Sequence, residues 1–258
     1  MLHITTEQIG AWLGAMYWPF IRISAMMLAA PVFSTASMPV RIRVIIAFAI
    51  TLAVYPALPP VPAVDPISLP GLMIVLQQAL IGVALGFILQ LAFQLLVIAG
   101  EAIAMTMGLG FARMMDPQNG VQVPVVSQYF IIFATLVFVT LNGHLLLIEL
   151  VMESFRELPI GVWGLSRESF WMLVSWGSQM FAGGVMVALP AVTALLVVNV
   201  AMGVISRAAP QLNIFAVGFP LMMLMGFILL ALTAPVMVSQ FTHYMLDAFR
   251  AAQELLRV

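Results

Sequence analysis

Long apolar runs, separated by short polar or proline-rich stretches, dominate the hydrophobic pattern of this chain. A helix needs about 20 apolar residues to cross a bilayer. The pattern predicts six helical spans, the second of which is short for a crossing. They cover Gln8–Ala30, Val44–Tyr55, Gly71–Thr106, Val125–Val151, Phe170–Ile205 and Leu212–Leu246. We therefore predict an all-α protein of the polytopic membrane type.

Prolines and glycines indicate where these helices turn or break. The stretch Pro56–Pro70 holds six prolines and is predicted to be a stiff, extended linker after the first helical hairpin. Pro190 interrupts the fifth apolar run, and Pro220 and Pro235 interrupt the sixth. Because proline removes a helical hydrogen bond, we expect about six long helices that are bent or broken and are arranged as hairpins.

The stretch Met105–Pro124 is neither a helical span nor an ordinary loop. Its glycines and prolines disfavour a regular helix, whereas its methionines and its phenylalanine make it too apolar for a solvated loop. Irregular backbone at membrane depth survives only where protein or a water-filled cavity surrounds it. We therefore expect this loop to be buried in an assembly. Its candidate functional residues are Met105, Met107, Gly108, Gly110, Phe111, Arg113, Met114, Met115, Asp116 and Pro117.

Composition places the chain in the membrane class and excludes several kinds of chemistry. Of 258 residues, 64% are hydrophobic and 7% are charged. The absence of cysteine and lysine excludes thiol and lysine nucleophiles, and the three histidines are isolated, so we expect no metal site, no cofactor and no enzymatic activity. The net charge of −1 and the scattered arginines leave no basic surface for nucleic acid.

Polar and small residues recur every fourth position along the third span. On a helix they form one ridge that favours close approach of another helix and interhelical hydrogen bonds. Ordinary packing within the chain is the favoured interpretation, and contact with a partner subunit is the alternative. The ridge consists of Gln78, Gly82, Gly86, Gln90 and Gln94.

Two charged residues lie inside apolar runs, where a charge costs several kcal/mol unless it is paired or hydrated. Arg22 needs a partner or a water-filled cavity, and the alternative is that it extends to an interface or lies outside the bilayer. Glu101 is expected to be paired, protonated or in contact with water, and it is a candidate functional residue. Alternating spans would place four arginines on each side of a membrane, so the positive-inside rule assigns no orientation.

Several motifs spread over the chain resemble one protein family. The motifs are GFILQLAFQ at Gly86–Gln94, AGE at Ala99–Glu101, MGLGFARMMDP at Met107–Pro117, NGH at Asn142–His144 and SRAAPQLNIFAVGFP at Ser206–Pro220. In these motifs the chain resembles the FliR family of flagellar type III export-gate proteins and their injectisome counterparts.

This resemblance implies a non-enzymatic subunit of the export gate in the bacterial inner membrane, at the flagellar basal body. It implies assembly with FliP and FliQ, contact with FlhB and with membrane lipid, and passage of unfolded substrates. Residues 1–165 would form FliP-like hairpins, with 105–124 as the plug of the closed pore, and residues 166–258 a FliQ-like hairpin. The gate would sit largely above the bilayer, which would explain the failed topology rule.

Two further groups of residues acquire roles from the resemblance. Arg207, which has small neighbours, is expected to anchor an adjacent subunit, with satisfaction of the last carbonyls of its own helix as the alternative. The turn between the two C-terminal helices is expected to be fixed by Pro210, Asn213, Gly218 and Pro220. The principal rival function is a stand-alone secondary transporter or channel that uses Glu101 as a proton-binding carboxylate.

Overall fold

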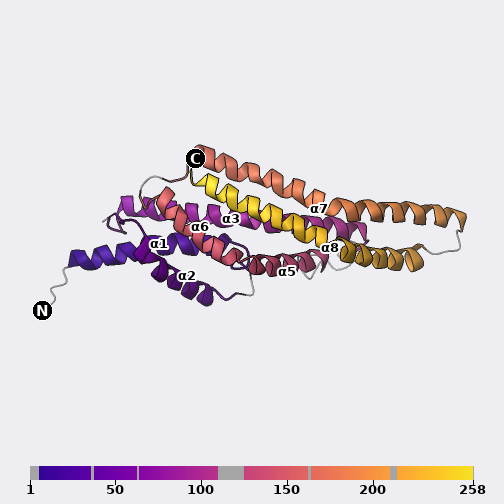
Figure 1. Cartoon of the computed structure of the whole chain (residues 1–258), viewed down its shortest axis with the longest axis horizontal. Helices are drawn as coiled ribbons and strands as arrows, with labels where there is room; N and C mark the ends of the chain where they lie inside the picture. The colour runs from indigo at the N-terminus through magenta and orange to yellow at the C-terminus, as the bar shows by residue number, and fades with distance from the viewer. Residues whose placement is uncertain are drawn as a thin grey trace. The chain divides into compact units, whose positions relative to one another are not determined.

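The computed structural model is helical throughout the part of the chain that it describes, which is residues 6–35, 38–62, 64–109, 125–161, 164–209 and 214–257. No strand occurs in those ranges, so the predicted all-α class is confirmed. Side chains are described from residue 16 of the first helix and from residue 217 of the last. The helices are α1 (Thr6–Ala29), α2 (Val40–Val54), the 3-10 turn η1 (Tyr55–Ala57), α3 (Leu69–Thr106), α5 (Val125–Thr140), α6 (Gly143–Glu157), α7 (Arg167–Ala208) and α8 (Ile214–Leu255), as Figure 1 shows.

Four segments among the described residues are long and apolar enough to cross a membrane. They are Val40–Ala57, Leu69–Thr106, Arg167–Ala208 and Val217–Leu255. The broken pair α5 and α6 would add a fifth if the two helices formed one span. The membrane-type architecture predicted from the hydrophobic pattern is therefore confirmed.

Two of the predicted span boundaries are wrong. The fourth span is two helices, because Asn142 takes a left-handed backbone conformation with φ of 55° and ends the run of helical hydrogen bonds between α5 and α6. The second helix begins at Val40, so Arg41 and Arg43 lie in its first turn and not in the preceding turn. An Asn-Gly pair tolerates the left-handed conformation far better than most dipeptides, which makes residues 142–143 the natural point of the break.

The prolines do not break the two C-terminal helices, so the expectation of breaks is wrong there, while the expectation that the prolines bend these helices stays a prediction. Pro190 lies inside α7, and Pro220 and Pro235 lie inside α8; both helices extend over 42 residues. Each proline removes one backbone hydrogen bond, but the many remaining bonds and the packing of a long apolar helix can maintain the helix around it.

The chain forms two compact units that do not follow chain order. Unit 1 comprises Met1–Leu91, Leu141–Gly177 and Met245–Val258, and unit 2 comprises Ala92–Thr140 and Ser178–Tyr244. The helices α3, α7 and α8 each contribute one segment to either unit. This division concerns compactness, whereas the expected FliP-like and FliQ-like segments, 1–165 and 166–258, concern resemblance and stay a prediction.

Each unit has its own apolar core. In unit 1, α1 packs against α2, and the rings of Phe20 and Phe48 meet edge to face at 6.4 Å. In unit 2, Phe93 of α3 lies edge to face with Phe138 of α5 at 5.8 Å and with Phe241 of α8 at 5.3 Å. These aromatic contacts join α3, α5 and α8 into one core, which holds the end of α3 in place.

Candidate functional site

Arg22 lies at the centre of a polar cluster in the core of unit 1. Its side chain is fully buried, although it belongs to the otherwise apolar α1. Its Nε donates to Oε1 of Gln78 on α3 at 2.8 Å, and its Nη1 donates to the carbonyl oxygen and the hydroxyl of Ser154 at 2.7 and 3.1 Å. Its Nη2 donates to the carbonyl oxygen of Leu158 at 2.8 Å. We call Arg22, Gln78, Ser154, Phe155 and Leu158 the Arg22 cluster.

The cluster explains how a cation is tolerated in this core. The last carbonyls of a helix have no partner within the helix and carry the negative end of its dipole. Ser154 lies in the last turn of α6 and Leu158 is its C-cap, so the guanidinium caps the end of α6. The guanidinium carbon also lies 4.2 Å from the centroid of the Phe155 ring, a favourable cation–π geometry. Arg22 therefore has its partners inside this chain and does not extend to an interface.

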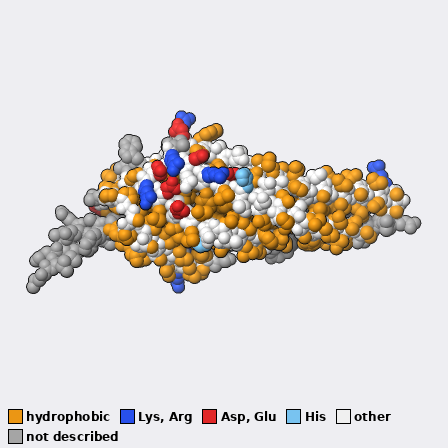
Figure 2. Space-filling model, in the orientation of Figure 1, with side chains coloured by type: hydrophobic (Ala, Val, Ile, Leu, Met, Phe, Trp, Pro, Cys, Tyr) orange, Lys and Arg blue, Asp and Glu red, His pale blue; other side chains and the backbone are white. Residues whose placement is uncertain are grey.

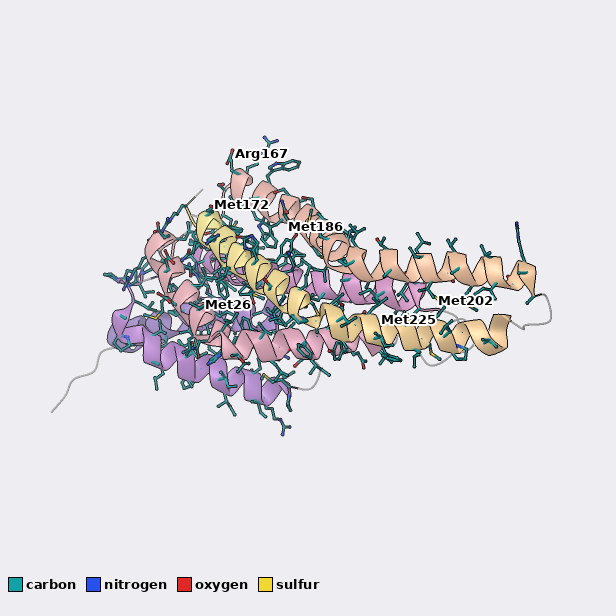
Figure 3. The ribbon with its side chains drawn as sticks, turned by 45° about the vertical axis from the view of Figure 1, so that its right-hand side comes forward. Met26, Arg167, Met172, Met186, Met202 and Met225 are labelled. Carbon is teal, nitrogen blue, oxygen red and sulfur yellow. The ribbon has the colours of Figure 1, made fainter. Side chains whose placement is uncertain are left out.

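Three members of the predicted ridge lie where α3 meets α1. Gln78 is fully buried, and the backbone of α1 passes directly over Gly82 and Gly86. A Cβ atom at Gly86 would lie 2.6 Å from the carbonyl oxygen of Met26 and 2.7 Å from the amide of Ala30. Met26 itself is buried, and Figure 3 labels it on α1. The two glycines thus allow the close helix approach on which the Arg22–Gln78 hydrogen bond depends.

The remaining ridge members and the isolated acid are less buried. Gln90 is half-buried, while Gln94 and Glu101 are exposed on the part of α3 that belongs to unit 2. Of the environments expected for Glu101, its exposure agrees with contact with water, and its functional role stays a prediction. Arg207 is exposed in the last turn of α7, also in unit 2. Within the described residues Arg207 makes no hydrogen bond or ion pair, so the predicted role as an anchor for another subunit stays a prediction.

The structure describes only the beginning of the predicted plug loop. Met105 is 61% exposed, Met107 is fully buried, and Gly108 has φ of 85°, a left-handed conformation that suits glycine. The other candidates of the loop lie outside the described residues. They are Gly110, Phe111, Arg113, Met114, Met115, Asp116 and Pro117.

The predicted C-terminal turn is shorter than expected. Gly218 and Pro220 lie inside α8, beyond its first turn, and so they do not form the connection between α7 and α8. Pro210 and Asn213 lie outside the described residues. The helix continues through Pro220 because this proline removes one backbone hydrogen bond from a helix that has many others.

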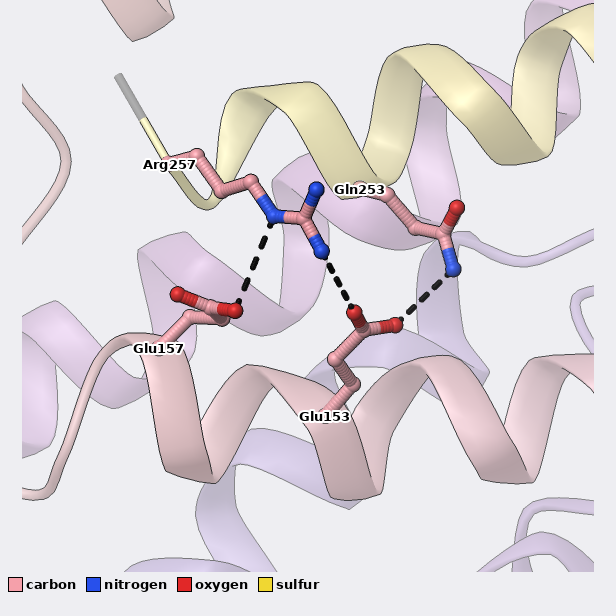
Figure 4. Close-up of polar contacts among 4 residues, drawn as sticks. All are labelled: Glu153, Glu157, Gln253 and Arg257. Carbon is pink, nitrogen blue, oxygen red and sulfur yellow. Dashed lines mark hydrogen bonds and ion pairs between the residues drawn. The ribbon is translucent and has the colours of Figure 1, made fainter.

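A set of ion pairs and a hydrogen bond between the chain's last turn and α6 was not expected from the sequence. Arg257 contacts Glu153 with Nη2 to Oε1 at 3.2 Å and Glu157 with Nε to Oε1 at 3.6 Å, and Gln253 donates to Glu153 at 2.9 Å (Figure 4). The sequence shows acids at one helix end and an arginine at the C-terminus, but nothing in it pairs segments about 100 residues apart. In Figure 2 charged side chains gather in one part of a largely hydrophobic surface.

Among the described residues, no group of three or more histidine, cysteine or acidic side chains is arranged to hold a metal ion. The organisation is that of helix packing and capping around one buried cation.

The sequence profile described as "Bacterial export proteins, family 1" matches residues 13–248, which is most of the chain. The chain belongs to this family of bacterial export proteins. Its resemblance to FliR proteins is also confirmed. The chain is 40% identical over 256 residues to the flagellar biosynthetic protein FliR of Escherichia coli K12, covering 99% of this chain and 98% of that protein. It is 31% identical over 250 residues to the FliR protein of Aquifex aeolicus, covering 97% and 95%.

Membership of the family agrees with the apolar helices. A bacterial export protein with four or five helices long enough to cross a membrane is a membrane component of an export system. Such a component is a structural or transport part rather than an enzyme. The similarity extends through both units, since the matched residues include every described helix except the first turns of α1 and the end of α8.

Proposed function

We propose that this chain is a non-enzymatic subunit of the flagellar type III protein export gate. In that gate it would form, with FliP and FliQ and next to FlhB, the channel for unfolded flagellar substrates. The observation that carries the proposal is identity of 30 to 40% with FliR proteins of Escherichia coli, Aquifex aeolicus and Bacillus subtilis over most of the chain. The expected location is the bacterial inner membrane at the basal body.

The surface of unit 2 supports a role inside an assembly. Along α7, large apolar side chains are exposed over a length that a soluble monomer would not leave uncovered. Figure 3 shows side chains projecting from α7, with Met186 and Met202 labelled, and Met186 is 64% exposed. Other exposed members are Phe181, Val185, Leu189, Leu196, Val197, Val200 and Val204. Lipid or neighbouring subunits must cover this face.

The loop 105–124 is proposed to be the plug of the closed channel. Methionine side chains are flexible and polarisable, so several of them make an adaptable seal around an irregular opening. Deleting Gly110–Met115 should increase ion leakage through the membrane while the gate still assembles. Loss of the assembled complex would instead indicate that this segment is a connector needed for packing.

Assembly is the first test of the proposed function. Co-expression with FliP and FliQ, followed by detergent extraction and size-exclusion chromatography, should yield one large complex that contains this chain. The rival transporter predicts a well-behaved monomer with transport activity in liposomes. That result would refute the gate proposal.

The substitution Glu101→Gln separates the same two functions. A proton-coupled transporter that uses this carboxylate would lose transport outright. In the gate, where Glu101 would be a packing residue exposed on this chain, the substitution should leave ion leakage at its low level and should either lower the amount of assembled complex or change it little. Export of flagellar substrates and swimming motility are the measurements in cells.

A further inference from the structure

The end of α3 is fixed by a complete Schellman motif. The amide of Leu109 donates to the carbonyl oxygen of Ala104 at 3.0 Å, and the amide of Gly108 donates to that of Met105 at 3.1 Å. Gly108 supplies the left-handed residue that this motif requires, with φ of 85°. The backbone at residues 107–109 therefore has one defined direction as it leaves α3.

The side chain of the preceding residue holds this end against α8. Met107 is fully buried, and a Cβ atom at Gly226 of α8 would lie 2.5 Å from its Cγ and Cε and 2.7 Å from its Sδ. The thioether therefore lies against the backbone of α8, in space that only a glycine leaves open. Two turns earlier on α8, the ring of Phe219 covers Gly108, where a Cβ would lie 3.1 Å from the ring.

Glycine at position 226 has a packing reason within this chain that Gly203 of α7 lacks. Glycine inside a helix is destabilising by about 0.5–1 kcal/mol relative to alanine. A Cβ at Gly203 of α7 would have no heavy atom within 4 Å inside this chain, whereas one at Gly226 would overlap Met107. Packing of Met107 thus accounts for the glycine in α8, and Gly203 provides a matched comparison.

We propose that Met107 and Gly226 are positioning residues that seat the end of α3 on α8 and so fix where the plug loop begins. This inference rests on the proposed function of the loop. The Schellman motif sets the direction of the chain at Leu109, and the Met107–Gly226 contact sets its place along α8. A shift of α8 is then transmitted directly to the first residue of the loop.

The test changes the size of the side chains at the Met107–Gly226 contact, which we call the seat. It then measures the mobility of the backbone at residue 109, where the chain leaves α3. The chain has no cysteine, so Leu109→Cys offers a single site for a spin label in the assembled gate. Gly226→Leu should shift the electron paramagnetic resonance spectrum of that label toward faster motion and raise ion leakage, with the amount of complex unchanged. Adding Met107→Ala to Gly226→Leu should return both readouts toward those of the parent, because it vacates the space that the leucine needs.

One control variant and two milder variants of the contact complete the test. Gly203→Leu adds the same bulk to a face of α7 that is open within this chain and, at an unchanged amount of complex, should change neither the label nor the leak. If Gly226→Leu lowers the amount of complex, the same two measurements are made on Gly226→Ala and on Met107→Ala, each as a single variant. Gly226→Ala adds less bulk than leucine, and Met107→Ala removes the packed side chain. An unchanged spectrum in those variants, or equal changes in Gly203→Leu, would overturn the proposal.

The deletion of Gly110–Met115 separates this inference from the plug function. A deletion that assembles and does not leak refutes the plug, while the label at residue 109 still reports on the seat. If the deletion leaks but the variants at positions 107 and 226 change neither the label spectrum nor the leak, the plug function stands and the positioning role of Met107 and Gly226 is refuted.

Discussion

The two units handle their charged side chains in opposite ways. Unit 1 holds every charged residue with a described side chain except two, and its one buried cation has hydrogen-bond acceptors on α3 and α6. Unit 2 holds Glu101 on α3 and Arg207 on α7, and both side chains are exposed. Unit 1 thus satisfies its buried charge from within, whereas unit 2 presents charge and apolar surface together to whatever surrounds it.

This difference indicates which part of the chain depends on its surroundings. In the most apolar window of α3, 67% of residues are buried inside the chain, against 22% for α7 and for α8 and 17% for Val40–Ala57 in unit 1. A helix with so little internal burial gains most of its packing from lipid or from other subunits. We therefore expect substitutions at the buried Arg22 cluster of unit 1 to change the stability of the chain, and substitutions on the exposed faces of α7 and α8 in unit 2 to change assembly.

The largest effect is expected from removing the buried cation. Arg22→Leu would leave the carbonyls of Ser154 and Leu158 and the amide oxygen of Gln78 without their donor, which should cost about 3–5 kcal/mol of unfolding free energy. Thermal unfolding of the detergent-solubilised complex measures this loss. Arg41→Leu is the matched control, because Arg41 is exposed at the start of α2. Equal unfolding temperatures for the two variants would contradict the capping role of Arg22.

The same substitution at two glycines should have opposite effects. Gly82→Ala places a Cβ against the carbonyl oxygen of Arg22 and 2.9 Å from the amide of Met26, so α1 must move away, at a cost of about 1–3 kcal/mol. Gly203→Ala meets open space and should stabilise α7 by about 0.5–1 kcal/mol. Unfolding temperatures of the detergent-solubilised complex test this contrast. A drop in complex yield for Gly203→Ala alone would show that a neighbouring subunit packs on that face.

The sequence predicted the helices well because their apolar runs are long. It predicted their interruptions poorly, since a proline removes one bond from a helix that has many, whereas Asn142 ends a helix through its own backbone conformation. Whether a residue interrupts a helix depends on the packing around it, and the pattern of apolar positions does not contain that information.

The Arg22 cluster shows the same limit for the candidate site. The sequence identified Arg22 as a charge in need of a partner and Gln78 as a member of a polar ridge. It did not connect them to the end of α6, because two of the acceptors are backbone carbonyls that any residue supplies. Position in space, and not residue type, makes Ser154 and Leu158 part of the cluster.

Substitution of Arg207 should reduce assembly of the complex and leave the unfolding temperature unchanged. Removal of a charged hydrogen-bond donor from an interface weakens association by about ten-fold, at roughly 1.5 kcal/mol. Arg207→Ala should therefore lower the yield of complex at unchanged unfolding temperature, and Arg207→Lys should restore part of it. Arg250→Ala, which removes an exposed arginine from unit 1, is the control. A normal yield for Arg207→Ala would contradict the role of this side chain as an anchor for another subunit.

The smallest effect is expected at the ion pair of the C-terminal turn. Arg257 is 60% exposed and Glu153 is 25% exposed, so solvent weakens their attraction, and surface pairs of this kind contribute about 0.2–1 kcal/mol. Glu153→Gln should lower the unfolding temperature slightly, and the difference from the parent should vanish at high salt because screening removes the attraction in the parent. Since Gln253 also donates to Glu153, a glutamine there retains an acceptor for that bond. A large, salt-independent loss would show that the end of α8 depends on more than this charge pair, and that unit 1 has a second polar centre beside Arg22.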